Sequence, residues 1–222
     1  MTLKEFLEHH KDIICWDDEF SRIAGPPDGW ITNGFKRHRV KRRLLKKLAD
    51  IGLLREPFDY FEFGVCDGQT TLIASYMFDH PDMRFYGFDT FTGMPEDFFY
   101  EDTLIAAKGS LSLNGKTPVD TWVIQDKRCT FFKGLVEDTL EGMLKIYTNR
   151  RKFIFIDVDL YAGSWFILNH MAHLFLPGDV ILFDEFVFER EEYRSYCDYV
   201  AKYGNNLKLI GRHINQFVFV VQ

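Results

Sequence analysis

The sequence predicts an α/β fold with a mostly parallel sheet, helices on both faces and an antiparallel hairpin at its C-terminal end. The chain has 222 residues, 46% of them apolar and 17% aromatic, which suits one sizeable hydrophobic core. From Asp59 onward, short runs rich in Phe and Ile alternate with segments of helical period, the pattern of βαβ units. Two further β runs end the chain and predict the hairpin.

The N-terminal segment, residues 1–58, is expected to be helical, with one loop, and to serve substrate binding or oligomer formation. One helix fits within Thr2–Gly25, and the turn residues of Gly25–Gly29 predict the loop. Phe35–Asp50 has helical period. Its apolar face consists of Val40, Leu44, Leu45 and Leu48.

The other face of the helix Phe35–Asp50 is basic. Such a helix can bind RNA or a phosphate-bearing substrate, but a charged face opposite an apolar stripe is usually solvated, and we favour that interpretation. The basic residues are Lys36, Arg37, Arg39, Lys41, Arg42, Arg43, Lys46 and Lys47.

The core domain is expected over residues 59–222. Its predicted strands are Tyr60–Val65, Arg84–Phe88, Thr130–Lys133, Phe153–Val158 and Val180–Phe183, and its predicted helices are Thr70–Phe78, Val136–Tyr147, Ser164–Phe175 and Glu191–Lys202. Leu207–Ile210 and Gln216–Val221 form the predicted hairpin.

A long segment without clear period, Thr92–Asp126, interrupts this alternation. A stretch of this length inside a compact domain is usually functional, so we interpret it as a lid or substrate loop. A short helix is expected within it, around Asp102–Lys108.

Charge and cysteine content narrow the class of protein. The formal net charge of −6 argues against a protein that coats nucleic acid. The four cysteines show no zinc or disulfide spacing, which favours a reducing compartment. No long uncharged apolar run occurs, so we expect a soluble, cytoplasmic protein without a membrane segment.

The first candidate site follows the strand that begins the core domain. Glu62 precedes a turn with Gly64 and Gly68, which leads into a helix at Thr70. Glycines let the backbone approach a ligand, while the acid disfavours a pyrophosphate and favours a positively charged group. An ordinary strand-to-helix turn is the alternative.

The second candidate is Asp89, at the end of the next strand. A carboxylate at this position accepts hydrogen bonds from ribose hydroxyls in nucleoside-binding α/β folds. The alternative is a cap of the following turn.

Two more strands end in carboxylates. Asp157 and Asp159 leave the same side of one strand, and Asp184 and Glu185 follow another. Four carboxylates at neighbouring strand ends would form an oxygen-only site suited to Mg²⁺ or a similar cation. Helix caps are the alternative.

The order of these motifs resembles the macrocin O-methyltransferase family over roughly Asp59–Phe186. The motifs are Glu62-x-Gly64-x-x-x-Gly68, Tyr86-Gly87-Phe88-Asp89-Thr90-Phe91-x-Gly93-Met94-Pro95, Phe132-Lys133-Gly134-x-x-x-Asp138-Thr139-Leu140, Ile156-Asp157-x-Asp159-Leu160-Tyr161 and Leu176-Pro177-Gly178-Asp179-x-Ile181-x-x-Asp184-Glu185-Phe186. The chain departs from the family where Phe186 replaces a tyrosine, Glu185 an aspartate, and Ala162-Gly163 a serine or threonine pair.

The resemblance implies a Rossmann-like class I methyltransferase that uses S-adenosylmethionine and a divalent cation, acts on sugar hydroxyls and forms a homo-oligomer. The cofactor residues that it implies are Glu62, Gly64, Gly68, Thr70, Asp89, Thr90, Gly134, Glu137 and Asp157. Asp157, Asp184 and Glu185 would bind the metal, and Asp157 or Asp159 would be the general base. Tyr161 and Trp165 are candidate contacts of the sugar or glycan acceptor.

Other functions remain as alternatives. A nicotinamide-dependent reductase would require G-x-G-x-x-G or Tyr-x-x-x-Lys, and neither occurs. A binding module without catalysis would leave the cost of four convergent carboxylates unrelieved. Methylation of RNA keeps the chemistry, but the net negative charge argues against it.

Overall fold

The computed structural model describes residues 1–16, 34–55, 57–100 and 102–222, with the side chains of helix α3 (Gly34–Asp50) described from residue 41 onward. The loop expected at Gly25–Gly29 lies outside the described residues. The side chains of Lys36, Arg37 and Arg39 lie outside them as well.

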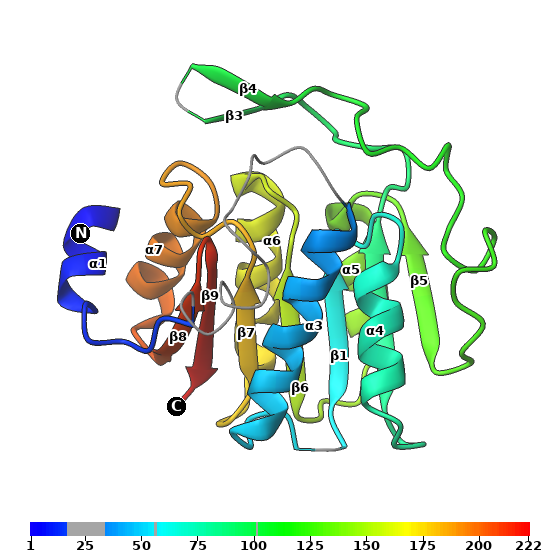
Figure 1. Cartoon of the computed structure of the whole chain (residues 1–222), viewed down its shortest axis with the longest axis horizontal. Helices are drawn as coiled ribbons and strands as arrows, with labels where there is room; N and C mark the ends of the chain where they lie inside the picture. The colour runs from blue at the N-terminus through cyan, green and yellow to red at the C-terminus, as the bar shows by residue number, and fades with distance from the viewer. Residues whose placement is uncertain (17–33, 56, 101) are drawn as a thin grey trace.

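A seven-stranded sheet with the strand order β5-β2-β1-β6-β7-β9-β8 forms the centre of the molecule (Figure 1). The first five strands in this order are parallel, and β9 and β8 add an antiparallel hairpin at one edge. The predicted fold class is therefore confirmed. The strands are β1 (Asp59–Phe63), β2 (Arg84–Asp89), β5 (Cys129–Lys133), β6 (Lys152–Ile156), β7 (Val180–Phe183), β8 (Leu207–His213) and β9 (Gln216–Val221).

The register aligns the carboxyl ends of the parallel strands. Phe63 of β1 is the partner of both Phe88 and Ile156, and Ile156 is the partner of Phe183. The residues that follow these four positions therefore emerge together at one edge of the sheet.

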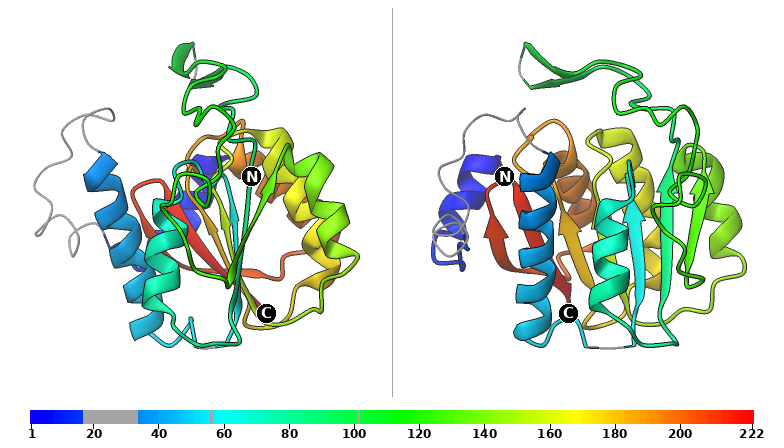
Figure 2. Two further views of the ribbon diagram at one scale, coloured as in Figure 1. Left: turned by 90° about the vertical axis from the view of Figure 1, so that its right-hand side faces the viewer. Right: turned by 45° about the vertical axis from the view of Figure 1, so that its right-hand side comes forward.

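Helices cover both faces of the sheet (Figure 2). α3 and α4 (Gln69–Met77) lie on one face, and α5 (Val136–Leu144), α6 (Tyr161–Met171) and α7 (Glu192–Tyr203) lie on the other. β1, β6 and β7 are buried along their whole length, as expected for parallel strands between two helical layers. α6 begins at Tyr161, three residues earlier than predicted, and a short 3₁₀ turn (Ala172–Leu174) follows it.

The residues before Asp59 contribute to the two larger hydrophobic clusters. Phe6 of α1 (Leu3–His9) packs with α7 and β9, while Leu44, Leu45 and Leu48 of α3 pack on the opposite face. The functions expected for residues 1–58, and the division at that point, remain predictions.

The lid segment differs from the prediction. Instead of a helix around Asp102–Lys108, β3 (Phe98–Tyr100) and β4 (Thr103–Ala106) form an antiparallel hairpin. The rings of Phe98 and Tyr100 each lie 5.1 Å from the ring of Phe188, which follows β7. This contact with a residue far along the chain favours extended backbone at Phe98–Tyr100. The hairpin lies above the carboxyl edge of the sheet (Figure 1).

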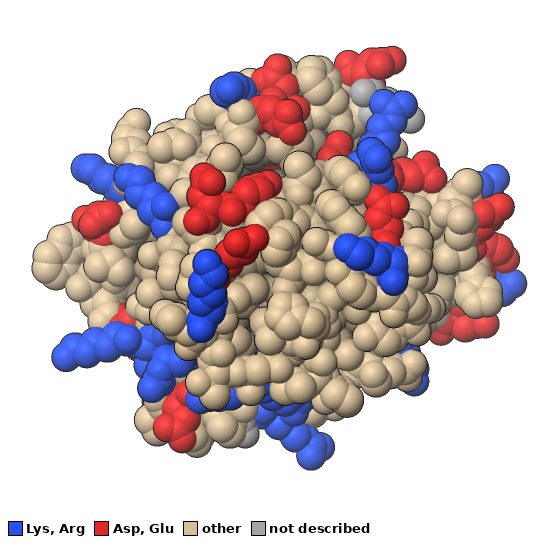
Figure 3. Space-filling view, turned by 180° about the vertical axis from the view of Figure 1, so that it is seen from behind, with Lys and Arg blue, Asp and Glu red and all other residues tan. Residues whose placement is uncertain are grey.

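Surface charge, cysteines and helix length bear on the expectations from the sequence. On the face formed by α5, α6 and α7, acidic and basic side chains are interspersed among uncharged ones (Figure 3). The four cysteines are all described, and no disulfide joins them. In the described ranges, no helix has the length and apolar character needed to cross a membrane.

Candidate functional site

A cavity of about 480 Å³ opens at the carboxyl edge of the parallel strands. The segments after β1, β2, β5 and β6 and the start of the lid segment form its walls. The chain reverses its direction of strand addition between β1 and β6, and ligands of open α/β sheets bind at such a switch point. The predicted site residues that line the cavity are Glu62, Gly64, Thr70, Asp89, Thr90, Gly134, Glu137, Asp157 and Asp159.

The turn after β1 approaches the end of β6 closely. Gly64 has a φ of +91°, and its N–H donates to the carbonyl oxygen of Phe88 at 2.9 Å. A Cβ at this position would lie 1.8 Å from the carbonyl oxygen of Asp157. Only glycine therefore fits, and backbone atoms form this part of the cavity wall.

Gly68 has a different role. It also has a positive φ, of +80°, but a Cβ there would lie 2.6 Å from Cγ of Pro118 in the lid segment. Because Gly68 has no side chain, the lid segment can pack against the start of α4. Gly68 is not part of the cavity wall.

Asp89 connects the two turns beside the cavity. Its Oδ2 accepts the N–H of Cys66 at 2.8 Å, and its Oδ1 accepts the N–H of Phe91 at 2.6 Å. The capping role weighed from the sequence is therefore present. Each carboxylate oxygen has two lone pairs, so these bonds leave acceptor capacity toward the cavity.

Glu62 is almost completely buried, with 1% of its surface exposed. Its Oε2 accepts hydrogen bonds from the hydroxyls of Thr71 at 2.7 Å and Tyr60 at 2.8 Å. Burial raises the pKa of Glu62 to about 7, although these two hydrogen bonds and the positive charge of Lys41 act to lower it. The group is therefore poised to change its charge when a cation enters the cavity.

The other cofactor candidates lie around the same cavity. Thr70 is buried at the start of α4, and the hydroxyl of Thr90 donates to the carbonyl oxygen of Gly93 at 3.1 Å. Gly134 donates its N–H to the carbonyl oxygen of Asp89 at 3.0 Å. Glu137 is exposed in the first turn of α5.

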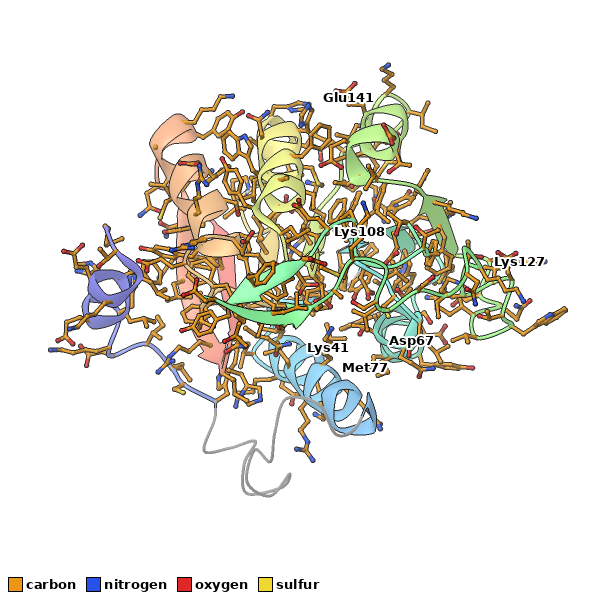
Figure 4. All side chains as sticks on the ribbon, turned by 90° about the horizontal axis from the view of Figure 1, so that it is seen from above. Lys41, Asp67, Met77, Lys108, Lys127 and Glu141 are labelled. Atoms are coloured by element: carbon orange, nitrogen blue, oxygen red, sulfur yellow. The ribbon has the colours of Figure 1, made fainter. Side chains whose placement is uncertain are left out.

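Lys41 of α3 lies between the acids that follow β6 and β7. Its Nζ is 2.5 Å from Oδ2 of Asp157 and 3.8 Å from Oδ2 of Asp184. The three side chains are 11%, 12% and 5% exposed, respectively. Figure 4, which views the molecule from the side of the carboxyl ends, shows Lys41 on α3.

The acids do not fit the Mg²⁺ site expected from the sequence. The ammonium of Lys41 lies where a cation would join Asp157 to Asp184. Oδ1 of Asp184 accepts from Nε2 of Gln216 at 2.5 Å, and Oε2 of Glu185 accepts from Nδ2 of Asn215 at 3.0 Å. Among the described residues, no three His, Cys, Asp or Glu side chains are arranged to hold a metal. The predicted metal set is thus unsupported.

The two candidate acceptor contacts face α7 instead of the cavity. The hydroxyl of Tyr161 donates to Oδ2 of Asp198 at 2.8 Å, and the guanidinium of Arg194 lies 4.1 Å from the centroid of its ring. The ammonium of Lys202 lies 5.7 Å from the ring centroid of Trp165. The structure does not bring either aromatic residue to the cavity wall.

Lys41 is the site residue that sequence reasoning missed. We expected it on the solvated face of its helix, and its contacts with Asp157 and Asp184 contradict that expectation. A signal was available, because Lys41 precedes Leu44, Leu45 and Leu48 by three, four and seven positions. That spacing places it on the apolar face of the helix.

Comparison with known proteins gives relatives by structure only. No protein-family model and no curated protein sequence matches the chain. The calicheamicin methyltransferase CalS11 superposes with a TM-score of 0.65 at 17% identity, covering 91% of this chain and 90% of that one. The O-methyltransferase NovP superposes with a TM-score of 0.61 at 19% identity, covering 92% and 88%.

A second structure of CalS11, described as an apo TDP-rhamnose 3′-O-methyltransferase of calicheamicin biosynthesis, has a TM-score of 0.59 at 17% identity and covers 91% of each chain. Together with the sheet order and the antiparallel hairpin, these likenesses identify the fold. The chain has the Rossmann-like fold of the class I methyltransferases.

Proposed function

We propose that the protein is an S-adenosylmethionine-dependent O-methyltransferase. The observation that carries this proposal is the cavity at the switch point, where Glu62 and Asp89 lie at the carboxyl ends of the neighbouring strands β1 and β2, and Asp157 and Asp159 follow the adjacent strand β6. Acids at the carboxyl ends of the first two strands suit a ligand that combines a nucleoside with a positively charged group.

The cofactor would lie with each of its parts against a different wall. Asp89 would accept the ribose hydroxyls, because both of its oxygens are already oriented by backbone N–H groups. The segment Gly134–Glu137 would lie along the adenine. Glu62 would receive the positively charged amino group of the methionine part, and the side-chain-free turn at Gly64 would allow close approach.

Methyl transfer would proceed by in-line displacement. The acceptor oxygen attacks the methyl carbon, the bond from that carbon to sulfur breaks, and its electron pair remains on sulfur as a neutral thioether. The hydroxyl proton must pass to a base. Asp157 and Asp159 both line the cavity, and either carboxylate would serve as that base.

We further propose a sugar hydroxyl of a glycan or small natural product as the acceptor. CalS11 is described as acting on TDP-rhamnose, and the sequence motifs resemble a family that methylates sugars. The net charge of −6 disfavours a nucleic acid as substrate. A homo-oligomer and a cytoplasmic location remain predictions.

Titration calorimetry with S-adenosylhomocysteine tests this function. We expect micromolar binding to the wild type, weakened at least about tenfold in Asp89→Ala, since hydrogen bonds to a charged group contribute about 1.5–3 kcal/mol. Asp138→Ala, at an exposed position outside the cavity wall, is the matched control and should bind as the wild type does.

Because Asp89 also caps two turns, circular dichroism and a thermal melt must first show that the variant is folded. Absence of binding by the wild type, or equal binding by folded Asp89→Ala, would refute the proposed cofactor site.

A further inference from the structure

The acids after β6 and β7 create an electrostatic problem at the cavity. Asp157 and Asp184 follow paired parallel strands, and both side chains are nearly buried. Glu192, which is fully buried, accepts the N–H of Glu185 at 2.9 Å beside them. Like charges at such close range in a poorly solvated place strongly favour a cation or a proton among them.

Lys41 supplies that cation from a fixed position. Its helix is anchored by Leu44, Leu45 and Leu48, which are 1%, 3% and 0% exposed. Its Nζ lies 4.8 Å from the ring centroid of Phe155 in β6, so the ammonium is held over the sheet as well as between the acids. An ammonium positioned in this way needs little reorganisation to interact with Asp157.

Neutral amide groups also donate hydrogen bonds to the acids that follow β7. Asn215 and Gln216, at the turn of the β8–β9 hairpin, donate their amide N–H groups to Glu185 and Asp184. A divalent cation would have to displace the Lys41 ammonium and compete with these amides for the carboxylate oxygens. The local architecture is therefore built around an internal cation.

We propose that Lys41 takes the place of a divalent metal ion in this site. Its ammonium holds Asp157 and Asp184 together and positions the Asp157 carboxylate at the cavity wall, which makes Lys41 a positioning residue and the site independent of metal. The proposal rests on the proposed function only in taking this cavity as the place of methyl transfer.

The test compares Mn²⁺ binding, measured by electron paramagnetic resonance, in the wild type and in Lys41→Ala. The variant lacks the ammonium that lies between Asp157 and Asp184, so we expect Lys41→Ala to bind one Mn²⁺ at least about tenfold more tightly than the wild type does. Adding Asp184→Asn to the variant should abolish that site. Lys46→Ala, on the exposed side of the same helix, should behave as the wild type.

A thermal melt establishes that each variant is folded, and Lys41→Met, which keeps the apolar stem, replaces Lys41→Ala if the latter unfolds. Equal Mn²⁺ affinity of the wild type and the variant, including no binding by either, would overturn the proposal. So would a Mn²⁺ site in Lys41→Ala that persists when Asp184→Asn is added.

The S-adenosylhomocysteine titration, run with EDTA, keeps the two proposals separate. If the wild type fails to bind that nucleoside while the Mn²⁺ results are as expected, the assigned function is wrong and the role of Lys41 stands. If the nucleoside binds only without EDTA, the metal independence of the site is wrong.

Discussion

Three carboxylates of the cavity differ in what engages them. Backbone N–H groups hold Asp89, the Lys41 ammonium holds Asp157, and two hydroxyls hold the buried Glu62. Asp89 and Asp157 therefore have fixed donors in the apo protein. Glu62 has only neutral donors, and burial raises its pKa to about 7, so its charge depends most on what the cavity contains.

We predict that the affinity for S-adenosylhomocysteine rises with pH through the pKa of Glu62. The ammonium of the ligand needs the ionised carboxylate, so binding releases a proton below about pH 7. Calorimetry should find about eightfold tighter binding at pH 7.5 than at pH 6, the change expected when a single group with a pKa of about 7 must lose its proton.

Glu62→Gln should bind with an affinity that does not change over this range, while Glu141→Gln, an exposed control on α5, should retain the wild-type dependence. Wild-type affinity that is flat or falls with pH would contradict the assignment.

The same pKa predicts how the stability of the ligand-free protein depends on pH. Because the pKa of Glu62 is higher in the folded than in the unfolded protein, its contribution to stability is present below about pH 4.5 and is lost as the pH rises through about 7.

At the scale of elements, local sequence predicts the strands and their chemistry well. The runs that become β6 and β7 are mostly apolar and are followed directly by acids, and Glu62 precedes the last residue of β1. Both the strands and the site at their carboxyl edge therefore follow from the sequence. The contacts of these acids do not follow from it. Lys41 reaches Asp157 across 116 positions, which only the packing of α3 on the sheet determines.

The β3–β4 hairpin could not be predicted for a similar reason. Its strands have three and four residues, and most of them are exposed, so no burial period marks them in the sequence. The contact that orients the hairpin comes from Phe188, which lies far along the chain and packs with Met94, Phe98 and Leu160. Tertiary packing, rather than local propensity, selects the extended conformation.

We therefore predict that Phe188→Ala loosens the hairpin selectively. Hydrogen exchange should become at least about tenfold faster at the amides of Phe98–Ala106, because these residues lose their principal apolar contact. The strands β1 and β6 should keep their protection. Tyr76→Ala, at a side chain that is 80% exposed, is the control and should leave exchange unchanged. Equal loss of protection in hairpin and sheet would show that Phe188 supports the whole fold instead.

At the scale of the whole molecule, the site joins parts that are distant in the chain. α3 supplies Lys41, the carboxyl ends of β1 and β2 supply Glu62 and Asp89, and the segment after β6 supplies Asp157. A ligand in this cavity would contact the central strands and a helix that is packed on them. Its binding energy should therefore stabilise the entire domain against unfolding, not one loop.

We predict that S-adenosylhomocysteine raises the melting temperature of the protein. At a ligand concentration one hundred times the Kd, binding adds about 2.7 kcal/mol, which for a chain of this size corresponds to about 5–10 °C. Differential scanning calorimetry should show one transition that moves as a unit. EDTA should not reduce the shift, because Lys41 already supplies the cation, whereas Asp89→Ala should reduce it. A shift that requires Mg²⁺ would mean that the acids after β6 and β7 hold a metal in the bound state despite the position of Lys41.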